Sequence, residues 1–202
     1  MNFDGSDLTE ILSGYAGGYG IAIDPANDTL YFGSHGTGIY TAQMDGSNAQ
    51  LLPNTSSGYN LLRHTHDIEV APSSQKLYYS NAEHNQFNRF KGIRRADLDG
   101  TGLEVVWDAS SDPVAALIAI DETNQQLYHS RELEGTIKKS NLDGTGESTI
   151  LSGFNEIYDV EVDPLEGKIY FSSSSLVGRA NLDGSGYELL TSLSGNRFDK
   201  GL

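Results

Sequence analysis

The sequence contains no cysteine, and it is poor in proline, tryptophan and basic side chains. Without cysteine, neither disulfide bonds nor thiolate-bound zinc can hold the fold together. Lys and Arg number 13 against 28 Asp and Glu, which gives a formal net charge of −15. A charge of this sign repels phosphate backbones and anionic lipid headgroups, so we expect no nucleic-acid binding.

Long apolar stretches are also missing from the chain. No run approaches the ~20 residues of a membrane-spanning helix, and residues 1–5 lack the basic and apolar regions of a signal peptide. We therefore expect no membrane insertion, although a mature secreted protein would have the same features. No window shows apolar residues at helical spacing between start and stop signals. Helices are accordingly not expected.

Glycine is plentiful, with 23 residues, and a short turn beginning with Asp-Gly recurs along the chain. Successive copies begin at Asp4, Asp45, Asp99, Asp143 and Asp183, which are 41, 54, 44 and 40 residues apart. Self-similarity at such a period indicates a repeat protein. We therefore interpret residues 1–202 as a single array without an internal domain boundary.

Each unit of the repeat contains four short segments rich in β-branched and aromatic residues. The first is an apolar run, found at residues 21–23, 68–70, 118–120 and 160–162. The second carries a tyrosine in register, at Tyr31, Tyr78, Tyr128 and Tyr170. Such segments, bounded by Gly, Pro, Asn, Asp or Ser, predict β-strands. Complete units cover residues 18–52, 66–107, 114–151 and 157–191, and one extra strand is predicted at 8–12.

Four consecutive strands joined by hairpins form a meander, and recurring meanders of this period predict the blades of a β-propeller. The predicted fold class is therefore all-β, a propeller with about four complete four-stranded antiparallel blades. The apolar first strand would be innermost, where neighbouring blades cover both of its faces and strict alternation is not required. A stacked solenoid is the alternative, but solenoid coils usually have shorter periods.

The Asp-Gly pairs predict tight turns between the third and fourth strands, because both residue types tolerate a left-handed backbone. These pairs are Asp45-Gly46, Asp99-Gly100, Asp143-Gly144 and Asp183-Gly184. Calcium binding is the alternative, but an EF-hand loop needs further oxygen ligands before its glycine and a glutamate at its end. We assign the pairs a structural role.

The segments Ile93–Gly100, Ile137–Gly144 and Gly178–Gly184 resemble one stretch of the YWTD repeat, the class B repeat of low-density lipoprotein receptors. The resemblance extends over nearly all of the chain. The Trp-Thr-Asp part of the motif is replaced by Phe-Gly-Ser, Tyr-Ser-Asn, His-Ser-Arg and Phe-Ser-Ser, so the chain is similar to a divergent member. The resemblance implies a binding propeller and an extracellular or cell-surface location.

Propellers of the family that the chain resembles have six blades, whereas four complete units are present here. The open edges of a partial ring invite pairing with another chain. We expect either a portion of a larger propeller or a ring completed by other copies of the chain or by a second chain.

In a meander, the irregular connections of this chain share one face of the propeller. Residues 53–65 and 81–91 are the longest of them. They bring together histidine, aromatic and charged residues that we take as candidates for contact with a protein or glycan partner: His64, His66, Asp67, His84, Phe87, Arg89 and Phe90. Loops held by a rigid scaffold are common binding sites, and the alternative is a solvated insertion without a partner.

Carboxylates interrupt two of the apolar inner strands, at Asp67, Glu69, Asp159 and Glu161. Buried charge must be paired or protonated, so this set is the candidate for a divalent cation or a substrate at the axis. His64 and His66 could add nitrogen ligands. The alternative is structural pairing with Arg94, Arg95, Lys138 or Arg179 from the third strands.

Two functions remain open at this point. The first is a non-enzymatic interaction module that binds a protein or glycan or assembles with other chains, without a cofactor. The second is a metal-dependent hydrolase resembling the gluconolactonase-type propellers, with Glu69, Glu161, Asp67 and His66 as its candidate residues. No Ser-His-Asp or Cys-His set is indicated by spacing, so catalytic residues are not assigned.

Overall fold

The computed structural model describes residues 6–18, 20–34, 36–53, 65–81, 92–109, 117–131 and 134–192. These residues form four antiparallel sheets, and each sheet contains four strands that are consecutive in the sequence. The only helical elements of this part of the chain are the short 3-10 turns η1 (Pro25–Asn27) and η2 (Pro72–Ser74). None of the described residues forms a helix long and apolar enough to cross a membrane.

Each sheet is one blade. Blade 1 contains β1 (Ile21–Asp24), β2 (Thr29–Ser34), β3 (Gly38–Gln43) and β4 (Gln50–Leu51). Blade 2 contains β5 (Thr65–Ala71), β6 (Lys76–Asn81), β7 (Gly92–Asp97) and β8 (Glu104–Asp108). Blade 3 contains β9 (Ile118–Asp121), β10 (Gln126–Arg131), β11 (Thr136–Asn141) and β12 (Ser148–Leu151). Blade 4 contains β13 (Ile157–Asp163), β14 (Lys168–Ser173), β15 (Leu176–Asn181) and β16 (Glu188–Ser192).

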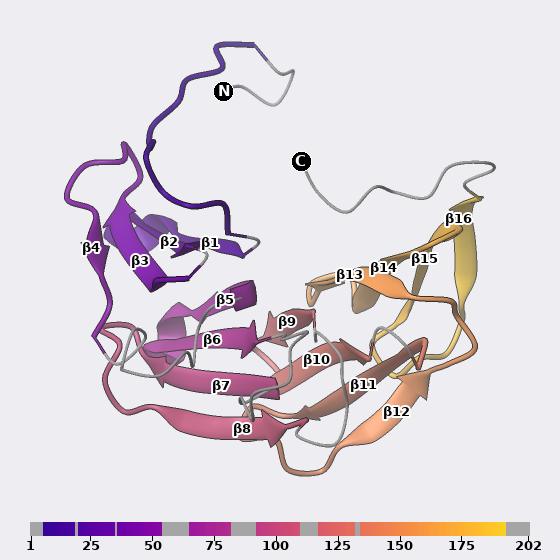
Figure 1. Ribbon diagram of the computed structural model, residues 1–202. Helices are drawn as coiled ribbons and strands as arrows, with labels where there is room; N and C mark the ends of the chain where they lie inside the picture. Colours follow the sequence, from indigo (N-terminus) through magenta and orange to yellow (C-terminus); the bar gives the residue numbers. More distant parts are fainter. Residues whose placement is uncertain are drawn as a thin grey trace.

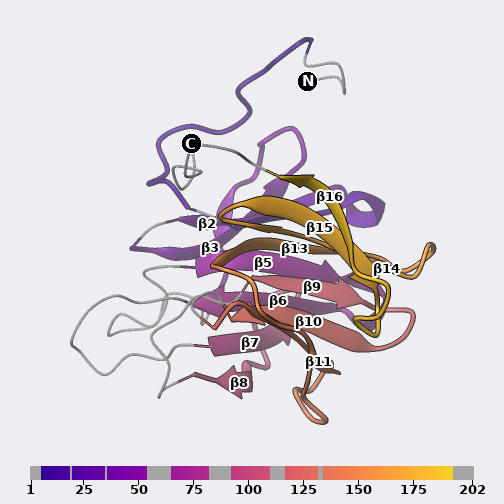
Figure 2. The ribbon, with the colours of Figure 1, turned by 90° about the vertical axis from the view of Figure 1, so that its right-hand side faces the viewer.

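The blades fan out from their first strands. β5 contacts both β1 and β9, and β9 contacts β13, so the first strands line the centre and the fourth strands lie at the rim. Figure 1 shows the resulting arc, with blades 1 and 4 at its two ends, and Figure 2 shows the strands of adjacent blades stacked as layers. The predicted fold, an all-β propeller with four complete blades, is confirmed.

The four tyrosines occupy the same place in every blade. In each case the tyrosine on the second strand lies opposite the corresponding residue of the third strand: the pairs are Tyr31 with Thr41, Tyr78 with Arg95, Tyr128 with Lys139 and Tyr170 with Arg179. The first three tyrosines are at most 4% exposed. Tyr170 is only partly buried because its face of blade 4 is not followed by another described blade.

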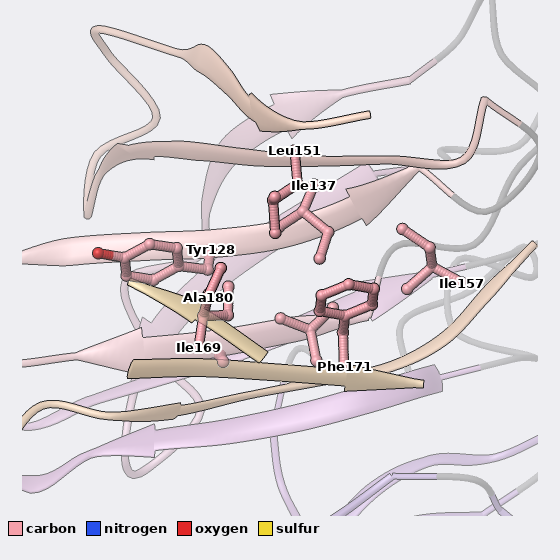
Figure 3. Packing of buried hydrophobic residues seen from close by; sticks show 9 residues of the cluster. Tyr128, Ile137, Leu151, Ile157, Ile169, Phe171 and Ala180 are labelled. Carbon is pink, nitrogen blue, oxygen red and sulfur yellow. The ribbon is translucent and has the colours of Figure 1, made fainter. Parts of the chain in front are cut away.

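The hydrophobic core consists of the seams between adjacent blades rather than one central cluster. Between blades 3 and 4, for example, Tyr128 and Ile137 pack with Val160, Ile169 and Phe171 (Figure 3). A second cluster joins blades 1 and 2, and a third joins blades 2 and 3. Because each blade is covered by its neighbours on both faces, its inner strand reads as an uninterrupted apolar run.

The Asp-Gly pairs form turns whose details differ from the expectation that both residues would be left-handed. Only the glycines have positive φ, between 81° and 86°. The aspartate instead accepts a hydrogen bond at Oδ1 from the backbone N–H two residues later, at 2.8–2.9 Å. This is a type I turn followed by a left-handed residue, which is the usual three-residue hairpin connection.

The turn glycines also contact the preceding blade. A Cβ at Gly144 would collide with the carbonyl oxygen of Val106 on β8, and one at Gly184 would collide with that of Ile150 on β12. Glycine is therefore required twice at these positions, once for the left-handed backbone and once for close approach of two backbones.

The strand predicted at residues 8–12 is not formed in the structure. A fourth strand needs a third strand to pair with, and no blade precedes this segment. A Cβ at Gly46 would nevertheless collide with the carbonyl oxygen of Ile11. Residues 8–12 thus lie where the fourth strand of a preceding blade would lie, although they pair with no strand among the described residues.

Candidate functional site

The two faces of the ring differ in the regularity of their connections. Every connection between first and second strands has four residues, and every connection between third and fourth strands has six. On the opposite face the connections range from two residues, 174–175, to thirteen, 52–64. Length varies where the scaffold does not constrain it, and such loops carry binding functions more often than uniform turns do.

Most of the candidate partner-binding residues belong to these variable connections. His64, His84, Phe87, Arg89 and Phe90 lie outside the described residues, so their placement stays a prediction. His66 and Asp67 lie near the start of β5, at the end of the connection 52–64, and both are partly buried. The inner strand of blade 2 therefore leads directly out of the longest loop of the irregular face.

A β-bulge at the start of β5 positions Asp67. The pairing with β6 shifts between Thr65 and Asp67, which re-aims the side chains on either side of the extra residue. Asp67 Oδ1 accepts the backbone N–H of Ile68 at 2.9 Å, and its Oδ2 accepts that of Ile118 at 2.8 Å. Asp67 therefore joins blade 2 to the inner strand of blade 3.

Burial raises the pKa of Asp67 to about 7 against the opposing effect of its two N–H bonds, and the charges of Asp159 and Glu161 raise it further. Burial likewise raises the pKa of Glu69 to about 9, with added repulsion from Asp67, Glu161 and Asp159. Glu69 is consequently protonated at neutral pH, since its pKa lies above 7.

Blade 4 repeats this arrangement at the end of the arc. The pairing of β13 with β14 shifts between Ile157 and Asp159, and Asp159 Oδ1 accepts the N–H of Val160 at 3.0 Å. Burial raises the pKa of Asp159 and of Glu161, in the latter case with a contribution from Asp159. Both side chains are more exposed than Asp67 and Glu69, because no described blade covers this face.

The basic residues expected to pair with these carboxylates bind other acids instead. Arg95 Nη2 contacts Glu104 Oε2 at 2.6 Å, Lys138 Nζ contacts Glu147 Oε1 at 2.7 Å, and Arg179 Nη2 contacts Glu188 Oε2 at 2.8 Å. Electrostatic repulsion links the carboxyls of β5 and β13 to one another. Within the described part of the chain, however, no three or more His, Cys, Asp or Glu side chains are grouped so that they could hold a metal ion. The cluster is thus a set of protonatable carboxyls around the axis.

Sequence reasoning missed a polar cluster in the seam between blades 2 and 3. His129 is 1% exposed and its ring lies 5.1 Å from that of Trp107, while the Arg131 guanidinium lies 4.8 Å from the Trp107 centroid. Glu147 contacts His129 Nε2 at 3.3 Å, Arg131 Nη2 at 3.4 Å and Lys138 Nζ at 2.7 Å. His129, and then Lys138, lower the pKa of Glu147 to about 2. A signal was present, since His129 stands where the other units have Phe32, Tyr79 and Phe171.

A second missed residue is Glu122, in the turn after β9. Its carboxylate accepts hydrogen bonds from the backbone N–H and hydroxyl groups of Ser73 and Ser74 on blade 2, at 3.1–3.3 Å. The other three units have proline at this position, at Pro25, Pro72 and Pro164. The exception to the repeat again marks a contact between blades 2 and 3.

Taken together, radial blades of uniform turns on one face and variable connections on the other define a repeat β-propeller. No protein-family model matches the sequence. Among curated proteins, low-density lipoprotein receptor-related protein 1 of Pyricularia oryzae is 26% identical over 197 residues, covering 84% of this chain and 61% of that protein. Low-density lipoprotein receptor-related protein 5 of Mus musculus is 26% identical over 188 residues, covering 92% of this chain and 11% of that protein. The resemblance is confirmed: the chain is a divergent YWTD-repeat propeller.

Solved structures share the fold at lower identity. A chain of the nidogen–laminin complex matches with a TM-score of 0.70 and 16% identity, over 87% of this chain and 62% of that one. A gluconolactonase from Xanthomonas campestris matches with a TM-score of 0.67 and 19% identity, over 88% of this chain and 62% of that one. At these identities the likeness shows the fold alone.

Proposed function

We propose that this chain is a non-enzymatic interaction module of the extracellular space or cell surface, and that its irregular face binds a protein or glycan. The observation that carries the proposal is the contrast between the two faces of the ring. Connections of four and six residues recur without exception on one face, whereas the other face holds connections of two to thirteen residues. Selection for structure alone gives uniform turns, and variable loops on a rigid scaffold are typical of recognition.

The relatives support the same function. Two of them are receptor-related proteins by name, and the nidogen–laminin structure is a protein complex. Because the chain spans 61% of the Pyricularia protein and 11% of the mouse protein, the partners of those proteins do not transfer directly. What transfers is the mode, a propeller that presents a loop face to a partner.

Replacing residues 53–64 with the short connection 152–156 of blade 4 tests the loop face. We expect the replacement to weaken binding at least about tenfold, which corresponds to ~1.4 kcal/mol, in surface plasmon resonance against immobilised laminin or on a glycan array. Leu165→Ser on the uniform face is the matched control, since Leu165 is 97% exposed there. Equal loss in both variants, or binding that survives the replacement, contradicts the proposed face.

The alternative function is a metal-dependent hydrolase similar to the gluconolactonase, and the observation in its favour is the group of axial carboxyls on β5 and β13. Calorimetric titration with Ca²⁺, Mg²⁺ and Zn²⁺ separates the two functions. Micromolar binding that disappears in Glu69→Ala and Glu161→Ala variants supports the hydrolase. The absence of binding supports the interaction module, which needs no cofactor.

The proposal has a second part, which concerns assembly. The arc ends at blades 1 and 4, and each of these blades has one sheet face that no described blade covers. Uncovered sheet faces and edges favour association. We propose that other copies of the chain or a second chain complete the ring.

A further inference from the structure

The two uncovered sheet faces are complementary halves of one contact. We call the face of blade 1 that carries Ile21 the incoming face, and the face of blade 4 that carries Asp159 and Tyr170 the outgoing face. Ile21 is 65% exposed, whereas Ile68, Ile118 and Val160, which have the same register, are each 1% exposed. The latter three are buried because a preceding blade covers them.

The internal seams show what such a pair of faces does when it closes. Between blades 2 and 3, Asp67 Oδ2 accepts the N–H of Ile118, and Arg95 Nη1 donates to the carbonyl of Leu142 at 3.2 Å. Between blades 3 and 4, the Tyr128 hydroxyl donates to the carbonyl of Leu182 at 3.4 Å. Both carbonyls belong to the residue directly before an Asp-Gly turn.

Blade 4 offers the donating half of this pattern at its outgoing face. Asp159 follows the same bulge as Asp67, and each of them lies opposite a serine of the second strand. Tyr170 and Arg179 stand at the positions of Tyr128 and Arg95. A blade placed here would receive the contacts that blade 3 receives from blade 2.

Blade 1 offers the receiving half at its incoming face, and one element is already in place. Ile21 corresponds to Ile118, and Met44 precedes its Asp-Gly turn as Leu142 and Leu182 precede theirs. The carbonyl of Ile11 lies against Gly46 as that of Val106 lies against Gly144. The preceding blade therefore has its fourth strand, residues 8–12, and lacks the other three.

We propose that the incoming face and residues 8–12 together form a docking surface for three antiparallel strands of this same repeat, which take residues 8–12 as their fourth strand. The inference rests on the proposed completion of the ring and names its partner: a polypeptide of this repeat that ends in a blade without an outer strand. A second copy of blade 4 does not fit, because its own β16 would compete with residues 8–12 for one place.

Extending the chain after Leu202 by a copy of residues 117–181 tests the proposal. This copy supplies blade 3 complete, whose incoming face matches Asp159, and the first three strands of blade 4, whose outgoing face matches Ile21. We expect hydrogen exchange of the amides of residues 8–12 to slow by at least about 100-fold relative to the unextended chain, as for ladder strands in stable sheets. The melting temperature rises, and the mass in solution remains that of one extended chain.

Two variants of the extended chain separate the parts of the inference. Ile21→Arg places a charge in the new seam and is expected to abolish both the slow exchange and the rise in melting temperature. Ile11→Pro removes one backbone donor and is expected to abolish the slow exchange at residues 8–12 while leaving most of the thermal gain. If Ile11→Pro changes nothing, ring completion stands and the role of residues 8–12 is wrong.

Two further outcomes overturn the proposal. An extension without slower exchange and without thermal gain contradicts both ring completion and the docking surface. An unextended chain that is already a dimer, with residues 8–12 protected, assigns the surface to a second copy. Neither outcome bears on the loop face, because the replacement of residues 53–64 measures that separately.

Discussion

Two seams of this propeller use the same register positions for opposite chemistry. The polar seam, between blades 2 and 3, holds His129, Lys138 and Glu147 beside Trp107 and Arg131. The aromatic seam, between blades 3 and 4, has Phe171 and Gly178 at the positions of His129 and Lys138. Tyr187 takes the position of Glu147, four residues after the turn aspartate.

The aromatic seam is closed by three rings. Phe154 lies 4.7 Å from Phe171 and 5.5 Å from Tyr187 in edge-on geometry, and Gly178 leaves room for them, since a Cβ there would lie 2.9 Å from the Tyr187 ring and 3.0 Å from that of Phe171. At the inner end, Asp67 and Glu69 of the polar seam correspond to Leu117 and Ala119 of the aromatic seam. The repeat therefore fixes the backbone contacts between blades and leaves the side chains of the seam free to vary.

The largest effect is expected from opening the aromatic seam. Phe171→Ala removes a ring that is 2% exposed, and large-to-small changes of buried aromatics cost about 3–5 kcal/mol. Phe32→Ala is the matched control, because Phe32 has the same register in blade 1 but lies on the uncovered incoming face and is partly exposed. Urea denaturation of both variants measures the difference, and equal losses would mean that coverage by a blade does not stabilise this position.

The next effect concerns the backbone contact that both seams share. Gly144→Ala and Gly184→Ala are each expected to destabilise by about 2–4 kcal/mol, from left-handed strain plus collision with the carbonyl of Val106 or Ile150. Gly153→Ala isolates the strain, since Gly153 has φ +90° and no neighbour within 4 Å of an added Cβ. Thermal melting that shows the same loss for all three glycines contradicts the required close approach.

These shared features were the predictable ones. The period, the tyrosine register and the Asp-Gly turns are local patterns, and every unit repeats them, so the sequence alone predicted four blades with Tyr31, Tyr78, Tyr128 and Tyr170 at equivalent places. The seams were harder to predict because their partners come from different units. Trp107 of blade 2 and Arg131 of blade 3 are 24 positions apart and belong to different sheets, and only the structure shows that they stack.

The candidate site was predicted unevenly for the same reason. The sequence identified Asp67, Glu69, Asp159 and Glu161 as carboxylates in apolar strands, but not which blade would cover each pair. Asp67 binds the backbone of Ile118, whereas Asp159 faces the open end of the arc. His129, Glu147 and Glu122 were overlooked because each looks unremarkable alone and is informative only as a departure from its equivalents in other units.

A smaller effect, confined to the polar seam, is expected from Glu147→Gln. The folded-state pKa of Glu147 is lowered to about 2, first by His129, so the carboxylate stabilises the fold above its ordinary pKa and the stabilisation is lost as pH falls from about 4.5 toward 2. Glutamine leaves His129, Arg131 and Lys138 without their acid. At pH 7 we expect a loss of about 1–2 kcal/mol, reduced for the partial exposure of Glu147.

The pH profile decides whether the loss is electrostatic. The difference between wild type and Glu147→Gln shrinks as pH approaches 2 and as salt is added. Tyr187→Phe changes the equivalent position of the aromatic seam and is expected to show neither dependence. A Glu147→Gln difference that is constant from pH 7 to pH 2 would mean that the side chain acts through packing.

The smallest effect has the opposite sign and lies at the inner end of the polar seam. Burial raises the folded-state pKa of Glu69 to about 9, above the ~4.5 of an unfolded glutamate, so the wild type loses stability as pH rises from about 4.5 to about 9. Glu69→Gln removes this dependence. We expect the variant to equal the wild type near pH 4 and to exceed it by about 1 kcal/mol at pH 8, a rise in melting temperature of about 2–4 °C. Glu161→Gln is the matched control on the uncovered face, where the raised pKa of Glu161 predicts a gain of the same sign but smaller size. If both gains are equal, the cover of blade 3 contributes nothing to the burial of Glu69, and the polar and aromatic seams differ in their side chains without differing in their electrostatics.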